Sequence, residues 1–142
     1  MTSVVDVWRA VDPEARLVSG DLAGLRRAVR GIHRTRSAAP HLPATADGSL
    51  LVIDAAIIGQ RSLDDLLAEL AIAEMHAIGV IIAGPTADRF REPAGSPIPV
   101  LASTRSVSWL ADGAERYLDS PEEALGRAAA ELRLAAAEAA LA

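Results

Sequence analysis

Three polar turns, each directly after an apolar segment, hold the side chains of this chain that are best suited to bind a small anion. A glycine lets the backbone approach a ligand closely, hydroxyls donate hydrogen bonds, and an arginine pairs bidentately with a carboxylate or another planar anion. The residues concerned are Asp54, Gly84, Thr86, Thr104 and Arg105. Because open α/β sheets bind ligands beyond the carboxyl ends of their strands, we expect these turns to converge on a small-molecule site. The alternative is that polar turns follow the strands and bind nothing.

The residue types needed for catalysis form no recognisable constellation. The chain has no cysteine, which excludes thiolate nucleophiles, thiolate zinc sites and disulfides. No serine lies in a G-x-S-x-G elbow, and neither G-x-G-x-x-G nor a Walker loop occurs. His33, His41 and His76 lack the spacing of metal ligands, and His76 is expected at the end of a helix, where an imidazolium suits the dipole. We therefore predict no catalytic residue, no metal ion and no cofactor.

The segments around the first two turns predict a β-α-β unit. Residues 49–59 form an apolar run without alternation, which is typical of a strand that is covered on both faces. Residues 62–79 predict a helix, with Ser62 as its cap and two aspartates in its first turn. Residues 79–84 predict a second buried strand. Because a helix joins the two strands, we expect a partly parallel sheet.

The other segments complete one α/β domain. Strands are predicted over 15–20, 28–35 and 99–104, and helices over 3–10, with a Ser3 cap, and from 106 onward. Residues 37–48 predict a loop, and 85–97 leave room for one helical turn. The expected fold is an α/β domain with a partly parallel central sheet flanked by helices and a long C-terminal helix. With 142 residues, 51% of them hydrophobic, the chain can build one such core.

Residues 120–142 are interpreted as a C-terminal helix or linker that follows a domain over residues 1–119. Ser120 is a suitable cap, and Pro121 suits the first helical position. One stripe of this helix is formed by Leu125, Ala129, Leu132 and Ala136. In one interpretation the stripe packs against the same helix of a second subunit, which makes a homodimer. In the other, a stable alanine-rich helix frays into a linker.

A basic segment stands out in a chain whose formal net charge is −5. Its arginines are Arg26, Arg27, Arg30, Arg34 and Arg36, and no acidic residue lies between Asp21 and Asp47. On a strand over 28–35 they would be solvated, or they would face acidic helices of the same domain or of a partner. Arginines on an edge strand also discourage pairing with another chain. Because the overall pI is about 5.1, we expect no direct binding of nucleic acid.

No segment indicates secretion or membrane insertion. The longest apolar run, residues 50–59, is interrupted by Asp54 and is too short to span a bilayer. No basic and apolar leader opens the chain. The lack of cysteine fits a reducing compartment. We therefore expect a cytoplasmic protein without a membrane partner.

The order of these segments resembles the amino-terminal domain of purine-catabolism (PucR-type) transcriptional regulators, over about residues 3–120. The glycine-turn-Leu-x-Arg-x-Val segment of that family corresponds to residues 24–29, its Leu-Val-Leu strand to 50–53, and its Leu-Pro-hydrophobic strand to 97–101. The resemblance implies a non-catalytic sensory or regulatory domain in transcription regulation, with a small-molecule effector that is purine-related or another planar anion. It also implies a helix-turn-helix module that binds DNA.

That DNA-binding module has no counterpart within residues 1–142. We therefore expect either a fragment of a longer regulator or a stand-alone relative. The alternative function is a small stand-alone α/β anion-binding module or enzyme that uses the residues at the strand ends.

Overall fold

A five-stranded sheet forms the centre of the domain. The computed structural model describes residues 2–37, 40–93, 98–119, 136–137 and 139–140. Within these ranges the strands are β1 (Arg16–Ser19), β2 (Ile32–Arg34), β3 (Leu50–Asp54), β4 (Gly79–Ala83) and β5 (Val100–Ser103), in the order β1-β5-β4-β3-β2. β2 to β5 run parallel, and β1 pairs antiparallel with β5. The predicted parallel pairing of the two buried apolar segments is confirmed.

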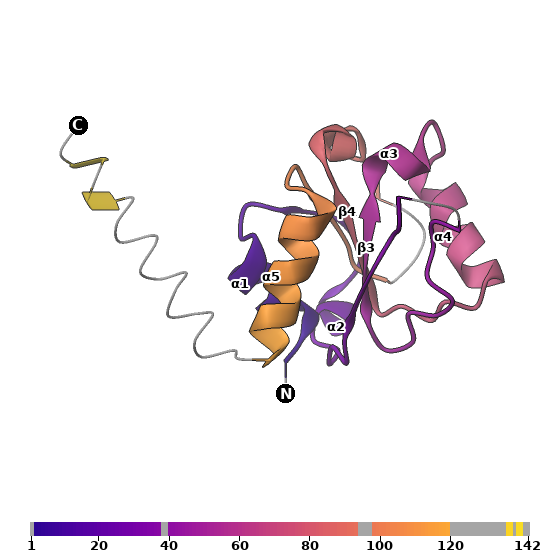
Figure 1. Ribbon diagram of the computed structural model, residues 1–142, viewed down its shortest axis with the longest axis horizontal. Coiled ribbons are helices and arrows are strands. Elements are labelled where there is room, and N and C mark those ends of the chain that lie inside the picture. The colour runs from indigo at the N-terminus through magenta and orange to yellow at the C-terminus, as the bar shows by residue number, and fades with distance from the viewer. Residues whose placement is uncertain (1, 38–39, 94–97, 120–135, 138, 141–142) are drawn as a thin grey trace.

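Helices cover both faces of this sheet (Figure 1). α1 (Val4–Val11) and α5 (Val107–Asp119) pack over one face, and α3 (Ala55–Ile58) and α4 (Leu63–Ile72) pack over the other. The short α2 (Leu22–Leu25) follows β1, and the 3-10 helix η1 (Pro85–Arg89) follows β4. Because successive strand residues point to opposite faces, Val52 of β3 packs with the α1 and α5 side and Ile53 with the α4 side. The predicted α/β class is therefore confirmed, with α5 as its C-terminal helix.

The strand predicted for residues 49–59 is wrong in its second half. β3 ends at Asp54, and the next four residues form α3. Asp54 has an extended backbone, and its Oδ1 accepts a hydrogen bond of 2.9 Å from the Ala56 N–H, which caps the new helix. Gly59, with φ of 62°, ends it. An unbroken apolar run suits a buried helical turn as well as a buried strand. The Asp54 cap therefore determines that residues 55–58 form a helix.

The helix predicted for residues 62–79 ends earlier than expected. Ser62 caps it as predicted, accepting from the Asp65 N–H at 3.1 Å, but α4 stops at Ile72. The turn that follows holds Glu74 at φ 53° and His76 at φ 52°, and it buries Met75 between them. The prediction that His76 ends a helix is therefore wrong, because the chain leaves the helical path to bury Met75.

The strand predicted for residues 28–35 is reduced to β2. Before it, Ala28 forms an isolated antiparallel bridge with Ser3, and the Val29 N–H donates to Thr2 O at 2.8 Å. The backbone of this stretch therefore pairs with the chain N-terminus before it joins the sheet. β2 has one neighbour, β3, and is an edge strand.

Candidate functional site

The carboxyl ends of β3, β4 and β5 lie side by side, as the strand-end prediction requires. The register pairs Asp54 with Ala83, and Ala83 with Ser103. Gly84 follows directly, and a Cβ atom added there would lie 3.6 Å from Asp54 Oδ1. The Gly84 N–H donates to Ser103 O at 3.0 Å and to Arg105 O at 2.8 Å. The three predicted turns are thus brought together by backbone hydrogen bonds.

Asp54 takes part in two hydrogen bonds that support the fold at the carboxyl end of β3. One of its carboxylate oxygens caps α3, and its own N–H donates to Thr35 Oγ1 at 3.1 Å. Thr35 is buried, so this bond fixes the end of β2 against the end of β3. The position predicted as a ligand contact therefore begins a helix.

The other predicted side chains at the strand ends point into solvent. Thr86 and Thr104 are both exposed. The Arg105 guanidinium lies over the indole ring of Trp109, 4.7 Å from its centroid, in a cation–π contact. Arg105 makes no ion pair with any residue that the structure describes. The strand ends therefore offer one exposed cation beside hydroxyl groups, on an open surface.

A partly buried hydrogen bond beside these turns was not predicted. Ser103 is 2% exposed, and its Oγ donates to Asp12 Oδ2 at 2.6 Å. Ser103 Oγ also accepts from the Arg105 N–H at 3.1 Å, and the other Asp12 oxygen accepts from the Glu14 N–H. Asp12 follows α1, 91 residues away from Ser103 in the chain. Only the antiparallel return of β1 beside β5 brings the two together, so no local sequence signal predicts the pair.

The basic segment lies on and near the edge strand, as the sequence indicates. Arg26, Arg27, Arg30 and Arg36 are exposed. Arg34 of β2 contacts the acidic side of α5, with Nη2 at 2.6 Å from Asp112 and 3.4 Å from Glu115. The hydrogen bond to Asp112 raises the pKa of the Arg34 guanidinium, and the bond to Glu115 adds to this effect. Both interpretations therefore hold, because four arginines are solvated and one faces an acidic helix of the same domain.

Most of the predicted dimer stripe lies outside the residues that the structure describes. Leu125, Ala129 and Leu132 fall outside the described residues. Ala136 is helical and exposed.

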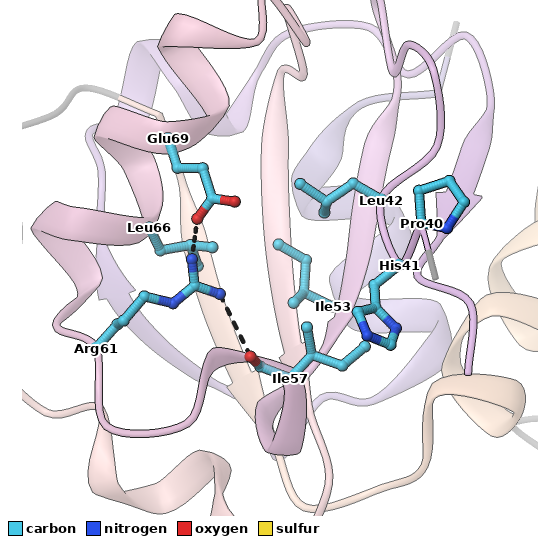
Figure 2. A pocket seen from close by; sticks show the side chains of 8 residues that line it. All are labelled: Pro40, His41, Leu42, Ile53, Ile57, Arg61, Leu66 and Glu69. Atoms are coloured by element: carbon cyan, nitrogen blue, oxygen red, sulfur yellow. Dashed lines mark hydrogen bonds and ion pairs between the residues drawn. The ribbon is translucent and has the colours of Figure 1, made fainter. Parts of the chain in front are cut away.

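A separate cavity of about 300 Å³ opens on the α4 face of the sheet (Figure 2). It is lined by Pro40, His41, Leu42, Ile53, Ile57, Arg61, Leu66 and Glu69. Figure 2 shows Arg61, Leu66 and Glu69 on one side, residues 40–42 on the other, and Ile53 between them. None of the five residues predicted at the strand ends lines it.

The polar groups of this cavity come from three segments that the sequence analysis did not combine. Arg61 Nη1 forms an ion pair with Glu69. Arg61 also donates to Ile57 O at 3.3 Å and, through Nε, to Ile58 O at 3.2 Å. The sequence offered one signal for this ion pair, which is that Arg61 and Glu69 lie on either side of Ser62, the cap of α4. The unpredicted helix α3 supplies the carbonyl groups, so the full arrangement could not be anticipated.

Metal ligation and membrane spanning find no support in the described part of the chain. Among these residues no three His, Asp or Glu side chains gather as a metal site. No helix among them has both the length and the apolar character needed to cross a bilayer. Comparison of the chain with family models, with curated proteins and with solved structures finds no match.

Proposed function

We propose that this chain is the non-catalytic sensory or interaction domain of a PucR-type transcriptional regulator, with DNA binding assigned to a helix-turn-helix outside residues 1–142. The observation that carries the proposal is the order of the sheet. The segment 24–29 leads toward β2, 50–53 belong to β3, and the described part of 97–101 enters β5. The second and third of these segments are thus parts of one sheet with a β3-α4-β4 crossover, and the first lies in α2 and in the chain that leads to the edge strand β2.

The non-catalytic part of the proposal is supported by how the carboxylates near the strand ends are used. Asp54 caps α3, and Asp12 accepts hydrogen bonds from Ser103 and from the Glu14 N–H. Both groups have structural partners that account for their positions. A cytoplasmic location and a role in purine catabolism belong to the same proposal.

The test is the native reading frame that encodes this chain. We expect an in-frame helix-turn-helix coding region downstream of codon 142. A frame that closes near codon 142 without such a region would remove the regulator assignment.

Homodimerisation through residues 120–142 is a second part of this proposal. Light scattering of the whole chain is compared with that of a chain ending at Asp119. We expect a dimer and a monomer, respectively. A truncated chain that remains dimeric would take this role away from the terminal segment.

A second candidate function is anion binding at the strand ends, which is favoured by the position of Arg105. This guanidinium is exposed, it has no described ion-pair partner, and it lies beyond the adjoining ends of β4 and β5. A thermal-shift screen with purines, ureides and carboxylates tests it, with Arg105→Ala and the matched surface variant Arg116→Ala. Stabilisation that only Arg105→Ala abolishes is expected. Absence of stabilisation, or equal stabilisation of both variants, would reject this candidate.

A further inference from the structure

The cavity on the α4 face has an aliphatic interior and a polar rim. Ile53 and Leu66 are buried core residues, and Leu42 packs against the same core from the loop before β3. The cavity volume of about 300 Å³ lies at the lower end of the range of small-molecule sites. A ligand that fills it therefore has a small apolar body.

The two opposite charges at the rim are paired with each other. Arg61 is held by Glu69 and by two carbonyl oxygens at the end of α3, so its guanidinium has a fixed position between α3 and α4. An anionic ligand would compete with Glu69 for Arg61, and a cationic ligand would compete with Arg61 for Glu69. An uncharged ligand that both donates and accepts hydrogen bonds can use the pair without breaking it.

His41 adds a hydrogen-bonding group on the opposite side of the cavity. Its Nδ1 lies 2.8 Å from Arg36 O, and a carbonyl oxygen can only accept, so Nδ1 carries the proton in the neutral ring. Nε2 is then an acceptor. The rim thus combines guanidinium donors, a carboxylate acceptor and an imidazole acceptor around an aliphatic interior (Figure 2).

We propose that this cavity binds a small uncharged molecule with an apolar body and one amide-type edge, in which an N–H and a C=O lie side by side. The amide edge meets the Arg61–Glu69 pair, and the body lies against Ile53 and Leu66. This inference deepens the sensory part of the proposed function, because it assigns a site and a ligand class to the sensor. It is distinct from the anion site considered at the strand ends.

The test is an NMR titration of the ¹⁵N-labelled chain with three matched probes. Nicotinamide is uncharged and has the amide edge, nicotinate is its anionic counterpart, and 3-(aminomethyl)pyridine is cationic. We expect nicotinamide to shift the amide signals of the cavity residues at lower concentration than the two charged probes do. Equal or stronger binding of nicotinate by the unmodified chain would overturn the ligand class.

Two cavity-filling variants locate the site. Ile57→Trp and Leu42→Trp each place an indole in the cavity, and Ile72→Trp adds the same side chain at an isoleucine that is 85% exposed on α4 and does not line the cavity. Nicotinamide shifts should be lost in both cavity variants and kept in Ile72→Trp. Shifts that persist in both folded cavity variants would place binding elsewhere and refute the proposal.

Charge variants test the role of the pair. Glu69→Gln leaves Arg61 without its carboxylate, so nicotinate should gain about fivefold in affinity at low salt. If nicotinate affinity does not rise, the pair does not control selectivity. Failure of all three probes to shift the cavity signals would reject the site while the regulator assignment, which depends on the downstream gene, would stand. A reading frame that closes near codon 142 would reject the regulator assignment and leave the cavity site standing.

Discussion

Among the described glycines, the one with the tightest contact to backbone atoms lies where β1 ends beside the start of β5, and its replacement gives the sharpest stability prediction. Gly20 has φ of 116°, and a Cβ added there would lie 2.6 Å from Pro99 Cα and 3.0 Å from Pro99 N. These are backbone atoms, and Pro99 O accepts a hydrogen bond of 2.9 Å from the Val80 N–H. Pro99 therefore cannot withdraw without disturbing the pairing of β4 with β5. We predict that Gly20→Ala is strongly destabilising.

The expected loss has two parts. A side chain at this positive φ costs about 1–3 kcal/mol, because only glycine adopts such backbone angles without strain. The clash with Pro99 adds about 1–3 kcal/mol, the usual cost of forcing extra atoms into a packed region. The free energy of unfolding should therefore fall by about 2–6 kcal/mol, which is a large share of the stability of a domain of this size.

Gly59→Ala is the matched control. Gly59 also has positive φ, at 62°, but a Cβ added there meets no atom within 4 Å. The entropy that alanine removes from the unfolded chain is common to both variants and cancels in their difference. Urea unfolding followed by circular dichroism gives both free energies by linear extrapolation. Gly20→Ala should be less stable than Gly59→Ala by about 1–3 kcal/mol, with unchanged m-values.

Equal losses in the two variants would refute the reasoning. In that case the backbone angle alone would determine the loss of unfolding free energy, and the start of β5 would be able to move away from the added methyl group. A lower m-value for Gly20→Ala only would mean that the variant had already lost part of its structure before unfolding.

Three further predictions concern polar contacts. Ser3→Ala should lose about 1 kcal/mol of stability near neutral pH, because Ser3 and Asp6 cap α1 reciprocally. Backbone and side-chain hydrogen bonds from Ser3 lower the pKa of Asp6 below its ordinary value of 3.8, so the stability that the Asp6 carboxylate contributes is present above that value and is lost as the pH falls through the lower folded-state pKa. Urea titrations from pH 7 to pH 2 should show the difference between the two proteins narrowing without vanishing, because the bond from the Asp6 N–H to Ser3 Oγ does not depend on this protonation. Arg34→Gln should lose less than about 1 kcal/mol, because the ion pairs are partly exposed, and the loss should shrink in 1 M NaCl; a loss that salt leaves unchanged would contradict a Coulombic origin. Asp54→Ala should lose about 1 kcal/mol by urea unfolding, whereas Asp54→Asn keeps the cap and most of the stability; equal losses would rule out capping as the role of this side chain.

The sheet core was predictable because its segments carry strong local signals. Residues 79–83 are apolar throughout and follow a helix whose cap at Ser62 is plain in the sequence, so the parallel neighbour of β3 could be predicted. The Ser3 cap of α1 was predictable for the same reason. These signals act between residues that are close in the chain.

The errors have physical causes of two kinds. Residues 55–58 are apolar in either state, and the side chain of Asp54 selects the helix through one hydrogen bond to Ala56. The early end of α4 depends on burying Met75 against the core, which is a tertiary contact. The two candidate sites also differ in whether local signals or tertiary contacts determine them. The strand ends could be predicted from topology, whereas the cavity depends on Arg61 reaching the unpredicted α3.

The packing of α1 against α5 has a consequence for synthesis on the ribosome. α5 is the last element of the described domain, and it covers Val52 and Ile81 together with the first helix of the chain. While residues up to β5 have emerged and α5 has not, only α1 and its neighbours can pack on that side of the nascent sheet, so part of it stays uncovered. Chaperone capture should therefore peak in nascent chains that expose the sheet but still hold residues 107–119 in the exit tunnel, and it should fall when the tunnel releases them.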